Sequence, residues 1–179
     1  MIASIKDEDF NIEAVNMKNY KTRYAARGII VRKDGKIAVQ LKKKKNEYKL
    51  IGGGIEKEEN AELAFKREAL EEAGCTVKII ANLGIIEEKR SLENLNQISY
   101  IYLAEVATNK KTLNLTDEEK TEEAVLKWFK PQEALKLIKN SFTNLTNTEE
   151  IDTYNIKFII QRDTKILEYY LKYQKEQLR

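Results

Sequence analysis

The sequence predicts an α/β protein in which helices cover both faces of a mixed β-sheet, as an α/β/α sandwich. Three observations predict this fold class. Segments rich in β-branched and aliphatic residues precede residues 60–73, which have the composition and the end signals of a helix. Further strand-like segments follow this helix, and the apolar residues near the end of the chain recur at helical spacing. Strands on either side of a helix, followed by more helices, are typical of such a layered fold.

Three strands are expected before the first helix. Residues 23–32 are expected to form the first, and Asp34-Gly35 is a tight-turn dipeptide that leads into a second strand over residues 36–42. Residues 48–51 are expected to form a short third strand, which runs into the glycines at 52–54. The sequence therefore predicts a sheet edge that ends in a glycine-rich turn.

The helix is expected to extend from about Asn60 to Ala73. Asn60 is a suitable N-cap because its side chain can accept a hydrogen bond from a free N–H of the first turn. Gly74 is suited to the left-handed position that ends a helix. Leu63 and Leu70 are expected to face the core, on the side opposite to the acidic residues of this helix.

The second half of the chain is expected to supply three strands, a polar loop and two helices. The strands cover residues 75–87, 97–106 and 122–129, with a polar loop over 108–121. A short helix is expected from Pro131, a residue well tolerated in a first turn, to residue 139. Residues 151–173 carry apolar side chains at helical spacing and predict a long terminal helix.

A single domain over residues 1–179 is expected, because no internal repeat or Pro-, Gly- or Ser-rich linker marks a boundary. Residues 1–20 show little pattern and are expected to be an N-terminal extension, whereas residues 149–179 are expected to add an extra C-terminal helix. The composition, with 34% charged and 42% hydrophobic residues, is typical of a globular protein.

Composition also excludes several function classes. With no histidine, the chain lacks His-based acid–base catalysis, a Ser-His triad and the common zinc sites. The net charge of +3 is too weak to favour a nucleic-acid partner, and no apolar stretch approaches the length of a membrane span. A single cysteine cannot form an internal disulfide framework, so we expect a cytoplasmic protein. The oligomeric state stays open, with a homodimer among the options.

Three carboxylates gather on one side of the expected helix. A helix advances about 100° per residue, so Glu68, Glu71 and Glu72 fall within roughly a quarter-turn of each other. Like charges at this spacing repel, and a hard divalent cation removes the conflict. Mg²⁺ prefers carboxylate oxygens and usually keeps a substrate phosphate in its shell. The residues therefore predict a magnesium site that handles phosphates.

The spacing of these residues resembles the signature of the Nudix hydrolases, G-x5-E-x7-R-E-U-x-E-E-x-G-U, in which U is a bulky aliphatic residue. All seven fixed letters are matched, by Gly53, Glu59, Arg67, Glu68, Glu71, Glu72 and Gly74. Ala69 and Cys75 are small for the aliphatic slots, Ile51 stands where proline is frequent, and Glu58 replaces a frequent glycine. None of these departures removes an expected metal ligand.

The resemblance implies a Nudix-type sandwich and assigns roles to the residues of the motif. Glu68, Glu71 and Glu72 are expected to bind Mg²⁺, for which Mn²⁺ can substitute, with the carbonyl of Gly52 as an extra ligand. Glu68 is also a candidate catalytic residue. Arg67 is expected to serve catalysis by holding a glutamate through a two-pronged hydrogen bond.

Residues outside the motif complete the expected site. Glu122 lies six residues before Trp128, and by resemblance to enzymes of the MutT type it is expected to complete the metal shell or to act as the base. Glu119 and Glu123 are the alternatives for this role. Arg23 and Arg27 lie on one face of the first strand and are candidates to bind a substrate phosphate, with a salt bridge as the alternative for both.

The resemblance also limits the substrate class, since the family typically cleaves a nucleoside diphosphate linked to another group. The ADP-ribose enzymes tend to carry a proline some fifteen residues beyond the motif, where this chain has residues 88–91 without one. The tyrosine typical of dinucleoside polyphosphate enzymes is absent as well. Elimination favours a nucleoside triphosphate. Hydrolysis of ADP-ribose, dinucleoside polyphosphates or RNA 5′ ends, and a non-catalytic nucleotide-sensing module, are the alternatives.

Overall fold

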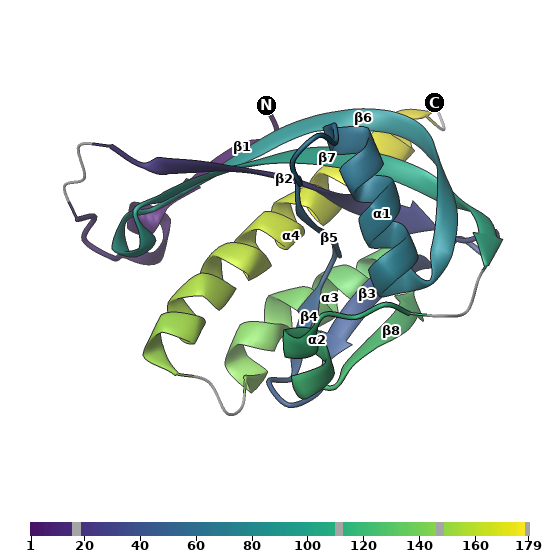
Figure 1. Cartoon of the computed structure of the whole chain (residues 1–179). Helices are drawn as coiled ribbons and strands as arrows, with labels where there is room; N and C mark the ends of the chain where they lie inside the picture. Colours follow the sequence, from purple (N-terminus) through teal and green to yellow (C-terminus); the bar gives the residue numbers. More distant parts are fainter. Residues whose placement is uncertain (16–18, 110–112, 146–148, 178–179) are drawn as a thin grey trace.

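The computed structural model describes residues 1–15, 19–109, 113–145 and 149–177, and within them eight strands form one mixed sheet (Figure 1). The strands are β1 (Ala3–Lys6), β2 (Lys21–Val31), β3 (Ile37–Lys42), β4 (Glu47–Lys49), β5 (Ile51–Gly54), β6 (Cys75–Arg90), β7 (Leu95–Asn109) and β8 (Ala124–Phe129). The α-helices are α1 (Ala61–Ala73), α2 (Asp117–Thr121), α3 (Pro131–Ser141) and α4 (Glu150–Gln177). Short 3-10 turns cover Asp7–Phe10, Ser91–Glu93 and Phe142–Asn144.

The sheet combines parallel and antiparallel pairs. Its strand order is β1-β6-β7-β2-β3-β4, while β5 pairs with β2 and β8 pairs with β3. β2 runs parallel to β7 and antiparallel to β5, so Arg27 stands opposite both Ile101 and Gly52. This pairing brings the glycine run directly against the strand that carries the two candidate arginines.

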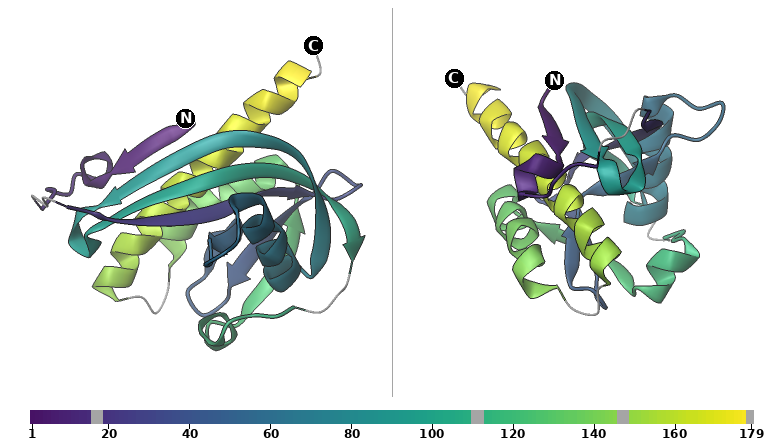
Figure 2. Two further views of the ribbon diagram at one scale, coloured as in Figure 1. Left: turned by 45° about the horizontal axis from the view of Figure 1, so that its top comes forward. Right: turned by 90° about the vertical axis from the view of Figure 1, so that its left-hand side faces the viewer.

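Helices cover both faces of the sheet, as the sequence predicts. Figure 2 shows α1 on one side and α3 with α4 on the other. The core on the α1 side includes Ala26, Ile30 and Phe65. The core on the α4 side includes Ile29, Ile101, Phe158, Ile166 and Leu167. Burial of these apolar side chains fixes the α/β/α sandwich and the extra C-terminal helix.

The ends of α1 form as the sequence predicts. The Asn60 side chain accepts a hydrogen bond of 2.9 Å from the Leu63 N–H. Gly74 ends the helix with φ 59°, a conformation that costs glycine little. The prediction for the core face was wrong at Leu63, which is 52% exposed, and Leu70 is only half-buried. Small side chains and one aromatic ring let α1 pack closely on the sheet, and they form its buried face: Ala64, Phe65, Ala69 and Ala73.

Two segments depart from the sequence-based expectation. Ala3–Lys6 forms a strand that pairs parallel with β6, although residues 1–20 carry little pattern. The polar loop expected over residues 108–121 contains α2, which begins with a capping box between Thr116 and Glu119. Residues 110–112 of this loop lie outside the described residues. Because Glu122 caps the end of α2, β8 begins at Ala124. No described helix combines the length and the apolar character needed to cross a membrane.

Candidate active site

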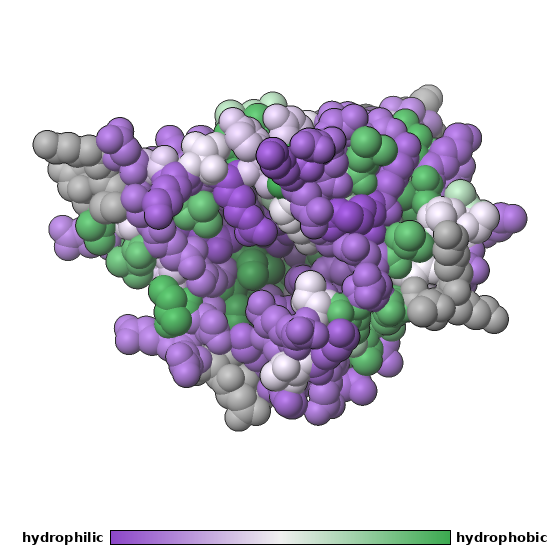
Figure 3. Space-filling view, viewed as in Figure 1, coloured by the Kyte–Doolittle hydropathy of each residue, from purple (hydrophilic) through white to green (hydrophobic). Residues whose placement is uncertain are grey.

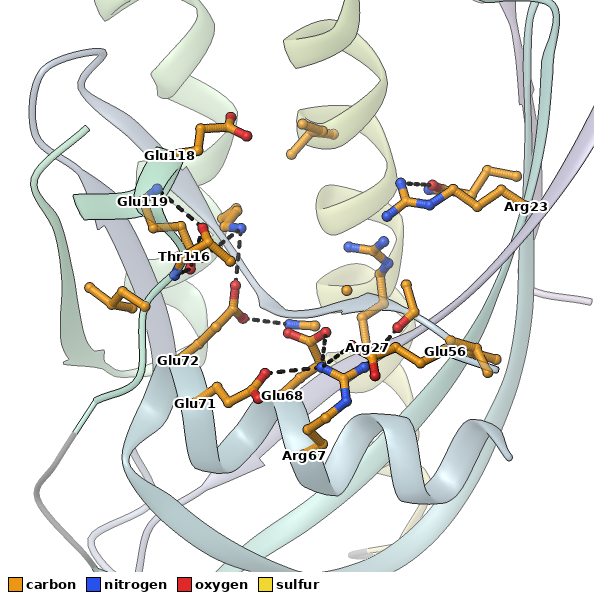
Figure 4. Close-up of a pocket in the computed structure, with 18 of the residues that line it drawn as sticks. Arg23, Arg27, Glu56, Arg67, Glu68, Glu71, Glu72, Thr116, Glu118 and Glu119 are labelled. Carbon is orange, nitrogen blue, oxygen red and sulfur yellow. Dashed lines mark hydrogen bonds and ion pairs between the residues drawn. The ribbon is translucent and has the colours of Figure 1, made fainter. Parts of the chain in front are cut away.

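A cavity of about 740 Å³ opens between the glycine run, α1, α2, the strand floor and α4. The face shown in Figure 3 is mostly hydrophilic and is hollowed near its centre. The acidic residues of α1 line one side of this cavity, and arginines of β2 line another (Figure 4). The predicted metal ligands Gly52, Glu68, Glu71 and Glu72, with Arg67 and the two candidate arginines of β2, therefore share one cavity.

The glycine run allows the backbone to approach both β2 and α1. Gly52 has φ 140°, and a Cβ atom there would lie 2.4 Å from the Ala26 carbonyl oxygen. A Cβ atom at Gly53 would lie 2.2 Å from Oε1 of Glu68. Side chains at these two positions would thus collide with a neighbouring strand or with a candidate metal ligand.

The three glutamates of α1 are each held by protein donors. Oε2 of Glu72 accepts a hydrogen bond of 2.8 Å from the Gly52 N–H, and its Oε1 lies 3.1 Å from Nζ of Lys49. Oε1 of Glu68 and Oε2 of Glu71 accept hydrogen bonds of 2.8 and 2.9 Å from the same nitrogen, Nη1 of Arg67. The side chains of Glu68 and Glu72 are largely buried, whereas that of Glu71 is partly exposed.

Arg67 links the glycine run, the loop that follows it and α1. Its Nε and Nη2 donate to the two carboxylate oxygens of Glu59, at 3.3 and 2.8 Å. Nη2 also donates to the Gly54 carbonyl at 2.9 Å. This two-pronged contact is the geometry in which a guanidinium fixes a carboxylate most firmly. Arg67 thereby orients Glu68 and Glu71 relative to the loop.

The structure brings Glu119, rather than Glu122, to the cavity. Oε1 of Glu119 accepts a hydrogen bond of 2.9 Å from Nε2 of Gln40, and it lies 3.7 Å from Nζ of Lys49. Glu122 is buried outside the cavity lining, where Lys42 and Lys45 each approach its carboxylate to 2.6 Å. Glu122 therefore does not face the cavity in this structure, because α2 ends at this residue and its carboxylate is paired with two lysines.

The acidic cluster carries excess negative charge. Burial raises the pKa of Glu72 to about 7, and attraction to Lys49 offsets only part of this shift. Burial also acts to raise the pKa of Glu119, but hydrogen bonds with Glu72 and Gln40 outweigh it and lower this pKa to about 2. The pKa of Glu68 is raised by burial despite its contact with Arg67. The carboxylates thus outnumber the two cations beside them, which favours a further cation.

The donor set fits Mg²⁺ by its chemistry. Carboxylate oxygens and a backbone carbonyl are hard ligands, which Mg²⁺ prefers to nitrogen or sulfur. No three carboxylates of the described residues converge on a common point as they stand. The reason is local, because Nη1 of Arg67 lies between Glu68 and Glu71, and Lys49 contacts Glu72.

Arg23 and Arg27 present their guanidinium groups to the cavity from the β2 side (Figure 4). Nη1 of Arg23 donates to Oε1 of Gln97 at 3.0 Å, and Nε of Arg27 donates to Oγ of Ser99 at 3.2 Å. Neither arginine has a carboxylate within 4.0 Å among the described residues. The salt-bridge alternative for this pair is therefore not the arrangement observed, and no ion pair with a described residue occupies either guanidinium.

A family model for the NUDIX domain matches residues 21–149, which is more than half of the chain. This chain belongs to the Nudix family. Nudix hydrolases cleave pyrophosphate bonds in nucleotide substrates, and the protein is a hydrolase of this class. The matched residues contain the whole glycine run, α1 and α2, and therefore all the carboxylates described above.

Solved Nudix structures share the fold at low sequence identity. A NUDIX hydrolase from Nitrosomonas europaea is similar with a TM-score of 0.55 and 16% identity, over 80% of this chain and 91% of the other. A MutT NUDIX hydrolase from Burkholderia pseudomallei has a TM-score of 0.50 and 19% identity, over 78% and 98% of the two chains. A NUDIX-family hydrolase from Clostridium perfringens has a TM-score of 0.49 and 23% identity, over 82% and 96%.

Sequence reasoning did not single out several residues that line the cavity or contact its carboxylates. Gln40 is a polar residue inside an otherwise apolar strand, and this position was a usable signal for a buried hydrogen-bond partner. Arg162 and Asp163 interrupt the apolar spacing of α4 in the same way, and both are buried. Lys49 gave no such signal, because it lies among other lysines near a strand end.

Proposed function

We propose that this Nudix enzyme hydrolyses a pyrophosphate bond of a nucleoside triphosphate with the help of Mg²⁺. The observation that carries this proposal is the division of one cavity into an acidic side and a basic side. Carboxylates on α1 and α2 suit a divalent cation, and the arginines of β2 suit the phosphate oxygens that the cation leaves free. A nucleotide phosphate chain is a ligand that needs both sides at once.

The metal would be held by Glu68, Glu71 and Glu72, with the carbonyl of Gly52 as a further ligand. When bound, Mg²⁺ supplies charge neutralisation for the phosphates and a more acidic water, and Mn²⁺ can replace it. Arg67 keeps Glu68 and Glu71 in position through its hydrogen bonds to both. The glycine run keeps side chains away from the space that the phosphates need.

Glu119 is the residue proposed to accept the proton from the attacking water. Its carboxylate lines the cavity, and the hydrogen bond from Gln40 fixes its orientation. The water oxygen forms a bond to phosphorus while the bridging P–O bond breaks, and the bonding electron pair leaves with the departing phosphate. The water proton passes to the Glu119 carboxylate. Glu68 is the alternative base, because its carboxylate lies directly against Gly53 of the glycine run.

The arginines of β2 are proposed to bind the substrate phosphates. Arg27 lies opposite Gly52 in the β2–β5 pair and lines the cavity together with the glycine run. Arg23 lies on the same strand face and also lines the cavity. Both guanidinium groups can donate hydrogen bonds to phosphate oxygens, and neither forms an ion pair with a carboxylate of the described residues.

A nucleotide panel tests this proposal. Purified protein is incubated with nucleoside triphosphates, ADP-ribose, a dinucleoside polyphosphate and capped or triphosphorylated RNA ends, with Mg²⁺ or with EDTA. Release of phosphate or pyrophosphate from a nucleoside triphosphate, in Mg²⁺ only, is the expected result. Faster hydrolysis of another compound of the panel would show that the substrate belongs to the class of that compound instead. Tight nucleotide binding without any turnover would instead identify a nucleotide-sensing module.

A further inference from the structure

The C-terminal helix α4 forms part of the cavity although it lies beyond the residues matched by the Nudix family model. Ile159 and Arg162 of α4 line the same cavity as the acidic residues of α1. The next residue, Asp163, accepts a hydrogen bond of 2.8 Å from the backbone N–H of Leu50, which enters the glycine run. The helix is therefore tied to the site rather than merely packed beneath the sheet.

α4 places Arg162 in a buried cluster of charges on the cavity wall. Oε1 of Glu88 lies 2.7 Å from Nη2 of Arg90, and its Oε2 lies 3.5 Å from Nη1 of Arg162. Nε of Arg162 lies 2.8 Å from Oδ1 of Asp163. The two carboxylates of this cluster, Glu88 and Asp163, are thus already paired with the two arginines Arg90 and Arg162.

Arg27 has no ion-pair partner among the described residues of this cluster, although Glu88 and Asp163 attract it from beyond ion-pair distance. Arg27 is only 5% exposed, and Ser99 accepts a hydrogen bond from its Nε. No described residue accepts a hydrogen bond from either terminal nitrogen, and no described carboxylate lies within 4.0 Å. Burial and the nearby charge of Arg162 lower its pKa, and attraction from Glu88 and Asp163 offsets only part of this shift. A buried guanidinium in this state is costly, and an anion delivered through the cavity would supply both its charge and its missing acceptors.

We propose that Arg27 and Arg162 form a second phosphate subsite, which binds the terminal phosphate of a triphosphate chain while the acidic side holds the preceding phosphates through the metal. This inference rests on the proposed function and adds to it a preference for the length of the phosphate chain. A diphosphate chain leaves the subsite empty, so the enzyme prefers triphosphates to diphosphates. The preference depends on Arg162 of α4, which is not part of the family signature.

Binding of inorganic tripolyphosphate and of inorganic pyrophosphate, measured by calorimetry at the same free Mg²⁺ concentration, tests the subsite without any dependence on the nucleobase. We expect the wild-type protein to bind tripolyphosphate about 10- to 100-fold more tightly than pyrophosphate, as a charge-assisted contact to one more phosphate predicts. Arg162→Gln and Arg27→Gln should each bring this ratio close to one. Lys172→Gln, on an exposed part of the same helix, should leave the ratio unchanged.

The two arginine variants separate a loss of phosphate binding from a loss of stability. Arg162→Gln removes a partner of Glu88 and of Asp163 and is expected to lower the melting temperature. Arg27→Gln removes a buried charge that has no ion-pair partner within 4.0 Å among the described residues, so the ligand-free variant should melt no lower than the wild type while still losing the tripolyphosphate preference. A ratio that persists in Arg27→Gln overturns the subsite.

The outcomes for the subsite and for the enzymatic function are separable. Equal binding of the two phosphates by the wild type, or binding of neither, overturns the subsite even if nucleoside triphosphates are hydrolysed. A preference for tripolyphosphate that is lost in both arginine variants supports the subsite. If that same protein hydrolyses no nucleotide, the proposed function fails while the subsite stands.

Discussion

Glu72 on α1 accepts a hydrogen bond from the backbone N–H of Gly52, with 2.8 Å between Oε2 and the nitrogen. This contact joins the helix that carries the acidic residues to the glycine run. Gly52 in turn lies against Arg27, where an added Cβ would come within 2.3 Å of the arginine Cβ. The acidic side and the basic side of the cavity are therefore held by one short segment of backbone.

Gly53→Ala is predicted to reduce turnover while leaving the fold intact. The new methyl group would meet Oε1 of Glu68, which is the movable end of a side chain, so Glu68 is displaced and the backbone stays in place. Gly52→Ala would instead meet the backbone of Ala26 and Arg27 at a φ that disfavours alanine, and we expect a loss of about 2–4 kcal/mol in stability. Steady-state kinetics and thermal melts of the two variants measure this contrast.

Gly35→Ala is the matched control, because it has φ 76° and an added methyl group meets nothing within 4 Å. It should lose about 1 kcal/mol of stability and keep its turnover. Unchanged kcat in Gly53→Ala would show that the position of Glu68 does not matter for the reaction.

Glu119→Gln is predicted to lower kcat by about 10²–10⁴-fold, the usual contribution of a general base. Glu122→Gln should keep most of its turnover and lose stability, because Lys42 and Lys45 would lose the charge that they share. Kinetics and melting curves of both variants are compared with Glu123→Gln, an exposed neighbour. A large kcat loss confined to Glu122→Gln would contradict the role proposed for Glu119.

Glu88 is predicted to contribute stability that depends on pH. Burial acts to raise its pKa, but attraction from Arg162, Arg90 and Arg27 outweighs this and lowers the pKa to about 2. A carboxylate whose pKa is lower in the folded state stabilises the fold above its unfolded-state pKa, near 4.5. That stability is lost as the pH falls from about 4.5 through about 2.

Glu88→Gln should therefore be less stable than the wild type by about 3–5 kcal/mol at neutral pH, since two buried arginines lose their shared partner. The difference should shrink as the pH falls through this window. Chemical denaturation at several pH values measures it. A difference that stays constant from pH 7 to pH 2 would mean that the charge of Glu88 is not the cause.

Local signals explain which parts of the fold could be predicted. Asn60 and Gly74 act on backbone groups within one turn of their own positions, so both ends of α1 follow from the sequence. β1 could not be foreseen, because Ala3–Lys6 is a strand only through its pairing with residues 86–89, far along the chain. Leu63 was expected in the core because it lies opposite the glutamates of α1, but Ala64 and Phe65 form the buried face of this helix.

In the candidate site, too, the residues that follow from local signals could be predicted and those that depend on tertiary packing could not. Spacing along one helix places Glu68, Glu71 and Glu72 together, because the helical repeat fixes their directions. Spacing to Trp128 did not identify the acidic residues of the cavity opposite them, because the α2 turn decides which carboxylates line the cavity, and these are Glu118 and Glu119. The contribution of Arg162 depends on the docking of α4 and has no local signature beyond a charge among apolar residues.

The rate of nucleotide hydrolysis as a function of free Mg²⁺ tests the central claim most directly. It is measured on the preferred substrate for the wild type, Glu71→Gln and Glu72→Gln, with Glu62→Gln on the exposed side of α1 as control. We predict no turnover in EDTA, recovery with Mg²⁺ or Mn²⁺, and loss of most turnover in both ligand variants, with the control unaffected. Full turnover in chelator, or near-normal rates in both ligand variants, would contradict the account.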